Sequence, residues 1–357
     1  MSRFLLFFSQ VVILFLSARA SSEMKKPTCQ DNGNVTTLQH FGYNVRHYEG
    51  VLIEVTPQSR FDYELDKLNL MNLGLWTIQE NAFKNVSATS LDLSSNWIFV
   101  LKRESFRGLP NLEMLSLYRN VVPLWGYLFA DLRNLTSLNL DSNKINSIPM
   151  DTFAGLSSLK SLSLFDNDIE AIEAESFSSL NPGLLSLWLS RNKISRVAPN
   201  SFAGLTELNS LNLADNRLED LPSCIFRGLN KLQELYLNDN RITSVSRSLL
   251  RDLVGLQLID LQRNEISALE PDTFRDLSQL IQLNLKKNKL SHIAVGTFAG
   301  LSNLKYIYLS YNKIQTVDNG TFTGLVKLRA LYFGGNNFTE IRKELSGLPY
   351  VILKKRT

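Results

Sequence analysis

The residues best suited to molecular recognition gather near the C-terminal end of the sequence. In the stretch YIYLSYNKI, residues 306–314, alternation along a strand would place Tyr306 and Tyr308 on one face and Ile307 on the other. Exposed tyrosines with charged neighbours are typical of protein-binding surfaces, although adjacent tyrosines on a strand can also do no more than stack on each other. The predicted ligand-binding residues are Tyr306, Tyr308, Tyr311, Tyr332, Lys286 and Lys287, with Trp188 and Tyr236 as a second group.

Residues that could carry out catalysis are few and scattered. The sequence has three histidines, His40, His47 and His292, and two cysteines, Cys29 and Cys224. None of them lies in a nucleophile–base pattern or at metal-ligand spacing, and no phosphate-binding loop is present. We therefore expect no enzymatic activity, no cofactor and no metal site.

A repeat with a period close to 24 residues organises the segments that carry these side chains. One register, L-x-x-L-x-L-x-x-N-x-I/L, recurs along most of the chain. A weaker first copy, LNLMNLGLWTI, has Leu73 in place of the asparagine, which makes twelve repeats. The asparagine position is occupied by Asn96, Asn120, Asn143, Asn167, Asn192, Asn216, Asn240, Asn264, Asn288, Asn312 and Asn336.

The period predicts how each repeat folds. In LYLNDNRITSV, Leu235 and Leu237 would point inward from a short strand, while Tyr236 and Asn238 would point outward. Because one repeat cannot bury its apolar edge, we expect the strands to stack into one parallel sheet, with the inward asparagines bonding backbone groups at each bend. A recurrent phenylalanine would anchor the convex segments to the core: Phe83, Phe106, Phe129, Phe153, Phe177, Phe202, Phe226, Phe274, Phe298 and Phe322.

These motifs resemble the typical class of extracellular leucine-rich-repeat proteins, such as Toll-type receptor ectodomains, small proteoglycans and insect secreted leucine-rich immune proteins. The resemblance covers residues 68 to about 350. It implies an α/β-type leucine-rich-repeat solenoid, or horseshoe, with a curved parallel β-sheet on the concave side and irregular or short helical segments on the convex side. Members of this class bind ligands through the concave sheet or a lateral edge, but the fold does not identify the ligand.

The predicted domain organisation is a signal peptide at residues 1–20, an N-terminal cap at 21–66, twelve leucine-rich repeats at 67–349 and a short C-terminal tail at 350–357. The cap segment 34–57 has two alternating apolar runs, so we expect a β-hairpin that covers the first repeat. At the other end, LPYVIL at 348–353 would cover the last repeat, whose edge would otherwise invite a partner.

The N-terminal sequence predicts export from the cell. An apolar run from Phe4 to Leu16 is too short to span a bilayer core about 30 Å thick, and Ala18 and Ala20 form a cleavage pattern. No later segment is long and apolar enough for a membrane span, so we expect a secreted, extracellular protein. Removal of the two arginines in this segment lowers the net charge from +4 to +2, which argues against nucleic acid as the main partner.

The two cysteines and the glycosylation sequons are the other sequence features that bear on an extracellular protein. Six strand spacings of about 4.8 Å separate Cys224 from the first repeat, too far for a bridge to Cys29. We expect Cys224 to be a packed thiol, while Cys29 favours an intermolecular disulfide and hence a homo- or hetero-oligomer. N-x-S/T sequons occur at Asn34, Asn85, Asn134, Asn319 and Asn337, and none of them lies on an outward strand position.

The resulting hypothesis is a secreted, non-enzymatic recognition protein of innate immunity, which binds protein or microbial-surface ligands through the concave face. The alternative is an extracellular-matrix or cell-adhesion protein with leucine-rich repeats. Both would use the same surface to bind an extracellular protein or glycoconjugate, so the sequence leaves both open.

Overall fold

The computed structural model describes residues 36–40, 43–58, 66–84, 86–174, 176–180, 182–338 and 351–352. Internal contacts divide the chain into two units, Met1–Thr36 and Thr37–Thr357, and nearly all described residues belong to the second. The predicted signal peptide, Cys29 and the sequon asparagines Asn34 and Asn85 lie outside the described residues.

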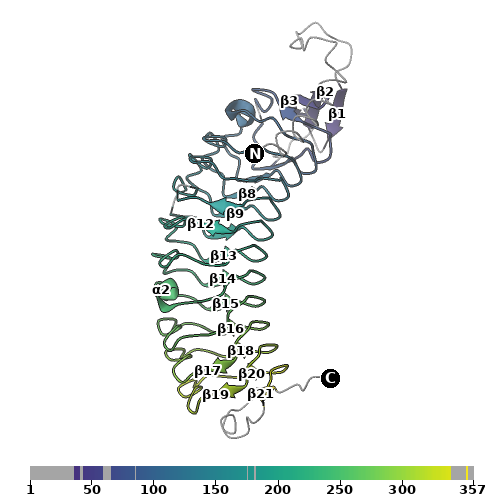
Figure 1. Cartoon of the computed structure of the whole chain (residues 1–357). Helices are drawn as coiled ribbons and strands as arrows, with labels where there is room; N and C mark the ends of the chain where they lie inside the picture. The colour runs from purple at the N-terminus through teal and green to yellow at the C-terminus, as the bar shows by residue number, and fades with distance from the viewer. Residues whose placement is uncertain are drawn as a thin grey trace. The chain divides into compact units, whose positions relative to one another are not determined.

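The second unit is a solenoid whose strands pair in one parallel sheet of thirteen strands, with the order of the strands following the order of the repeats. Figure 1 shows the central strands β13 to β16 lying one beside the next. The strands are β4 (Lys67–Asn69), β6 (Ser90–Asp92), β7 (Met114–Ser116), β8 (Ser137–Asn139), β9 (Ser161–Ser163), β11 (Ser186–Trp188), β13 (Ser210–Asn212), β14 (Glu234–Tyr236), β15 (Leu258–Asp260), β16 (Gln282–Asn284), β18 (Tyr306–Tyr308), β20 (Ala330–Tyr332) and β21 (Val351–Ile352).

From β4 to β20, each strand of the large sheet has three residues, and the central residue lies in the core. In β11 the side chain of Leu187 is fully buried, whereas Ser186 and Trp188 lie on the outer face. The register is in step throughout, so that Leu187 pairs with Leu162 on one side and Leu211 on the other. The central residues therefore form one continuous apolar row, with Ile259 and Ile307 in place of leucine, which confirms the predicted parallel solenoid.

The asparagine ladder bonds backbone groups where each strand ends. Asn240 is 8% exposed, and its Oδ1 accepts a hydrogen bond from the Leu218 N–H of the preceding repeat at 3.0 Å. Its Nδ2 donates to the carbonyl oxygens of Leu213 at 2.9 Å and Leu237 at 3.1 Å. The same pattern recurs at the other ladder positions, so the predicted role of these asparagines is confirmed.

The recurrent phenylalanines are buried core residues, and several neighbouring rings stack on each other. All ten predicted side chains are buried. Phe177 stacks between Phe153 and Phe202, with ring centroids 6.2 Å and 6.1 Å away. This row anchors the convex segments, which contain only short helices among the described residues: the 3-10 helix η1 (Arg103–Phe106) and α2 (Arg247–Leu250).

A separate sheet lies against the first repeat, with the strand order β1, β2, β3, β5. The predicted hairpin is present as the antiparallel pair β2–β3, joined by Glu49 and Gly50 in left-handed conformations. The parallel pairing of β3 with β5 connects it to the first repeat. The structure adds β1, which was not expected as a separate strand. The strands are β1 (Thr36–His40), β2 (Tyr43–Tyr48), β3 (Val51–Pro57) and β5 (Thr77–Ile78).

The remaining strands form two small parallel pairs, β10 (Ala171–Ile172) with β12 (Arg196–Val197), and β17 (His292–Ile293) with β19 (Thr316–Val317). The backbone of His292 pairs with that of Thr316 and so lies in β17. At the C-terminal end, β21 pairs with β20. This pairing covers the edge of the last repeat, as LPYVIL was expected to do. It also places a strand within the segment predicted to be a tail.

Candidate functional site

On the outer face of the large sheet, each strand from β4 to β18 presents its first and third side chains, and two more come from the residues that follow it. The alternation that buries the leucines makes this face the place where the repeats differ from one another. From β16 to β20 the face carries the tyrosines and lysines predicted from the sequence, and from β11 to β15 it carries a group of charged residues.

Four tyrosines, Tyr306, Tyr308, Tyr311 and Tyr332, form a tyrosine cluster on β18, on β20 and after β18. Tyr308 and Tyr332 are direct cross-strand partners, and their rings stack with centroids 4.6 Å apart at an interplanar angle of 3°. Tyr306 is half-buried on the same face, whereas 56% of Tyr311 is exposed. The structure thus brings the predicted tyrosines together, with Tyr311 at the margin.

Lys286 and Lys287 follow β16 and border the tyrosine cluster. The Lys286 Nζ lies over the Tyr311 ring, 5.6 Å from its centroid, which is a cation–π distance. Lys287 is exposed and has a left-handed backbone with φ of 57°.

Burial raises the pKa of the Tyr308 hydroxyl, and Tyr332 and Tyr306 raise it further. The Tyr308 hydroxyl therefore stays protonated at neutral pH and can donate a hydrogen bond.

Trp188 and Tyr236, the second predicted group, lie in one row of the outer face but do not touch. Asn212 on β13 pairs with both and separates them. Trp188 is 36% exposed, while the Tyr236 hydroxyl lies 3.3 Å from the Glu234 carboxylate, to which it donates. Burial raises the pKa of Tyr236, and the charge of Glu234 adds to this. Trp188 and Tyr236 are therefore two separate aromatic side chains on this face and do not form one cluster.

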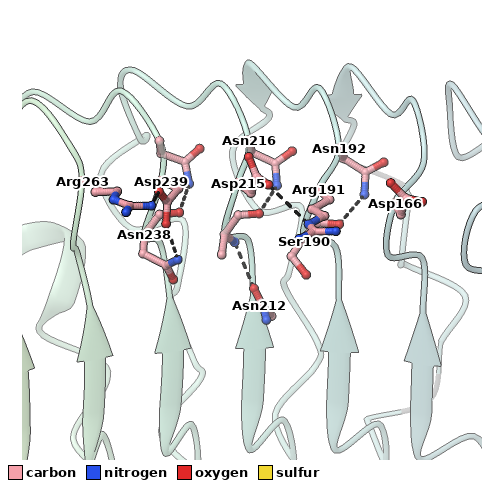
Figure 2. Close-up of polar contacts among 12 residues, drawn as sticks. Asp166, Ser190, Arg191, Asn192, Asn212, Asp215, Asn216, Asn238, Asp239 and Arg263 are labelled. Carbon is pink, nitrogen blue, oxygen red and sulfur yellow. Dashed lines mark hydrogen bonds and ion pairs between the residues drawn. The ribbon is translucent and has the colours of Figure 1, made fainter.

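In the region of this second group the outer face has a polar hollow of about 720 Å³, which we call the mid-sheet hollow and to whose lining Tyr236 belongs. Figure 2 shows Arg263 reaching Asp239 across neighbouring repeats, with Arg191 and Asp215 further along the same row. The Arg263 Nη1 lies 3.0 Å from Asp239 Oδ1, and the Arg191 Nε lies 3.6 Å from Asp215 Oδ2. The residues that line it are Phe165, Ser190, Arg191, Asn212, Ala214, Asp215, Tyr236, Asn238, Asp239, Asp260 and Arg263.

Asp260 is the carboxylate of this hollow that has no cationic partner among the described residues. Burial raises its pKa, hydrogen bonds from the Gln262 backbone and the Asn284 side chain oppose the rise, and the charge of Asp239 adds to it. The hollow was not predicted from the sequence. The residues that directly precede the ladder asparagines, such as Arg191 and Asp215, are a periodic signal that could have revealed it.

The other candidate residues are dispersed. Cys224 is a free, half-buried thiol with the Arg251 Nη2 at 3.9 Å from its sulfur, so it is less enclosed than the packed thiol expected from the sequence. His292 bonds the Thr316 hydroxyl at 2.8 Å through Nδ1. His47 is half-buried in β2, and the side chain of His40 lies outside the description. Within the described ranges, no helix has the length and apolar character required to cross a membrane.

Three of the sequon asparagines are described, and all three are exposed: Asn134, Asn319 and Asn337. The Asn134 Nδ2 donates to the Pro110 carbonyl oxygen at 2.9 Å. Asn134 also borders a second polar hollow of about 460 Å³, which is lined by Asp66, Ser87, Thr89, Asn111, Glu113, Asn134, Thr136 and Ser158. None of the three belongs to a strand of the large sheet.

Comparison with known families places the repeats in one group. A model described as "Leucine rich repeat" matches residues 64–122 and, in overlapping segments, residues 126–338. These segments together exceed half of the chain. The match begins near the first repeat strand and ends beside the last ladder asparagine.

Comparison with individual proteins gives partial matches. Toll-like receptor 3 of Boselaphus tragocamelus is 40% identical over 80 residues, which are 21% of this chain and only 9% of the receptor. A solved LRR protein of Leptospira interrogans has a TM-score of 0.62 at 26% identity, over 81% of this chain and 78% of that one. The mouse RP105/MD-1 complex has a TM-score of 0.68 at 22% identity, over 80% of this chain and 50% of the matched chain, which shows likeness of fold.

Proposed function

Because the chain belongs to the leucine-rich-repeat family, we propose that it is a secreted, non-enzymatic recognition protein of innate immunity. It binds an extracellular protein or glycoconjugate, including ligands on microbial surfaces, through the outer face of the large sheet. The similarity to a Toll-like receptor over part of the chain supports the immune assignment. The apolar segment at the N-terminus supports secretion.

The observation that carries this proposal is the tyrosine cluster with its neighbouring lysines. Aromatic residues near the centre of an interface, surrounded by charged residues, account for much of the binding free energy in protein complexes. Here Tyr308 and Tyr332 form a rigid stacked pair on the outer face, and Tyr311 is exposed beside Lys286. A rigid pair loses little conformational entropy when a ligand binds.

Glycosylation would leave this surface accessible. We propose that Asn34, Asn85, Asn134, Asn319 and Asn337 carry N-linked sugars. The three described asparagines are exposed and lie off the strands of the large sheet. Enzymatic removal of N-linked sugars should lower the apparent mass and leave ligand capture unchanged, while a loss of capture would place the sugars in the binding surface.

The decisive experiment compares capture from native extracellular fluid by the tagged protein and by its Tyr306→Ser/Tyr308→Ser variant. A specific partner should be recovered with the wild type and depleted with the variant. Loss of the Tyr308 stack should cost about 0.5–1.5 kcal/mol of stability, so circular dichroism must show that the variant is folded. Tyr127→Ser is the matched control, because Tyr127 is 50% exposed and lies outside the sheet.

Equal recovery by both proteins would move the site away from the tyrosine cluster. Identification of the partner separates the two biological roles. A microbial-surface component or a circulating defence protein would support recognition in innate immunity, and a resident matrix protein would favour the adhesion alternative. A non-reducing gel of the same material tests the proposed intermolecular disulfide through Cys29.

A further inference from the structure

From β11 to β20, charge divides the outer face of the large sheet into two parts. The mid-sheet hollow contains three aspartates and two arginines, and both arginines pair with aspartates. On the outer face, the residues of β16, β18 and β20 and those between each strand and its ladder asparagine include no carboxylate, and two of them are lysines. We call this second part the basic–aromatic end; it consists of Lys286, Lys287, Tyr306, Tyr308, Tyr311 and Tyr332.

The lysines of the basic–aromatic end are available to a ligand. Many cations of this solenoid pair with an acid of an adjacent repeat, and Lys289, just past the ladder asparagine, does so with Glu265 at 2.6 Å. Lys286 and Lys287 have no ion-pair partner among the residues that the structure describes. Lys305 and Arg329, which directly precede β18 and β20, add positive charge at the border of the same region. This surface therefore has uncompensated positive charge.

Contacts within the protein occupy part of the ring surface of the tyrosine cluster. Tyr308 and Tyr332 each cover one ring face of the other, and their stack runs along the row of strands. Tyr311 lies between Lys286 and Gly335, where a Cβ on the glycine would come within 2.7 Å of the ring. A sugar ring that stacks needs a free face, whereas aromatic edges and phenol hydroxyls favour negative groups.

From this geometry we propose that the basic–aromatic end binds an acidic protein segment, whose carboxylates contact Lys286, Lys287 and the tyrosine hydroxyls. The excess of acids in the mid-sheet hollow repels such a segment and confines it to β16–β20. Like charges placed together disfavour a wrong position, so the charge division also sets the position of the ligand along the sheet. This inference rests on the proposed function, because it identifies the ligand class of the same surface.

The test measures binding of short fluorescent peptides to the full chain by anisotropy. The probe alternates glutamate with glycine, and two comparison peptides have glutamine or lysine in place of glutamate. We expect the glutamate peptide to bind better than the other two and to dissociate as salt concentration rises. Lys286→Gln/Lys287→Gln should weaken its binding about tenfold, since two exposed charge contacts are lost.

The matched control is Lys84→Gln/Lys327→Gln, which removes the same charge from exposed positions elsewhere and should leave binding unchanged. Equal weakening in both variants would show that net charge alone attracts the peptide, and would overturn the proposal. So would absence of glutamate-peptide binding. Binding of heparin without binding of the peptide would assign the surface to anionic polysaccharides instead.

The two proposals fail in distinguishable ways. If the Tyr306→Ser/Tyr308→Ser variant loses the native partner while the Lys286→Gln/Lys287→Gln variant retains it, the surface is a binding site but its ligand is not acidic. If both variants retain the partner, the proposed binding face itself is wrong.

Discussion

Replacement of Asn240 by alanine tests whether the asparagine ladder stabilises the solenoid by satisfying buried backbone groups. The Asn240 Oδ1 accepts from the Leu218 N–H, and Nδ2 donates to the carbonyl oxygens of Leu213 and Leu237. The adjacent ladder asparagines also donate to these two carbonyl groups, Asn216 to Leu213 and Asn264 to Leu237. Alanine therefore leaves the Leu218 N–H without a partner, while each carbonyl oxygen keeps one donor.

The expected loss follows from this difference. A buried N–H without a partner costs about 1–3 kcal/mol, and each of the two lost donors adds about 0.5–1.5 kcal/mol. We therefore expect Asn240→Ala to lower the free energy of unfolding by about 2–6 kcal/mol. Asn240→Asp should be at least as damaging at neutral pH, because it keeps the acceptor for Leu218 but directs a carboxylate oxygen at two carbonyl groups.

Urea unfolding followed by circular dichroism and by tryptophan fluorescence measures this loss, and coincidence of the two curves checks that unfolding is two-state. The matched control is Asn238→Ala, two residues away on the outer face, where the side chain is half-buried and bonds Asp239. A surface substitution of this kind should change stability by no more than about 0.5 kcal/mol. If the two variants lose equal stability, satisfaction of the backbone by the ladder is not the stabilising factor.

Three further predictions concern the core and the two parts of the outer face. Phe177→Ala should lower the free energy of unfolding in urea by about 3–5 kcal/mol, and a loss below about 1 kcal/mol would contradict the role of the aromatic stack. The pKa of Asp260 is higher in the folded protein than the ordinary aspartate value of 3.8, so ionisation of Asp260 destabilises the fold as pH rises above 3.8. The Asp260→Asn variant cannot ionise at this position and should therefore gain stability relative to the wild type over the same pH range. A pH series of urea midpoints that runs parallel for both proteins would refute this. Gly335→Ala should displace Tyr311 and weaken binding of the glutamate peptide. The control is Gly324→Ala, which has a similar positive φ but no atom within 4 Å of the added Cβ and should affect stability alone. Equal peptide binding by the two variants would argue against a role for Tyr311.

Much of the fold could be predicted from the repeat because each repeat must bury the same apolar residues and satisfy the same backbone polar groups. Asn240 and Phe177 are core residues for reasons visible within one or two repeats: the polar groups at a bend need partners, and the convex segment needs an apolar anchor. The hairpin of β2 and β3 was also predictable from alternation. Strand β1 was missed because its sequence, TTLQH, has a single apolar residue and so lacks the alternation on which the hairpin prediction rests.

The candidate site was predictable only where it depends on alternation along one strand and on register between adjacent strands. Tyr308 and Tyr332 lie 24 residues apart, so the period itself brings them side by side. By contrast, Trp188 and Tyr236 remained separated by one strand. The ion pairs of the mid-sheet hollow depend on side-chain conformations across adjacent repeats, which the period leaves open.

The solenoid, its parallel register and the identity of the buried ladder could be predicted from the amino-acid sequence, because they follow from a local period that every repeat satisfies in the same way. Which outward side chains meet, which lysines lack an ion-pair partner among the described residues and which tyrosine faces are covered became visible only in the folded chain. Those properties depend on distances and orientations between neighbouring turns, and it is these that select what the outer face can bind.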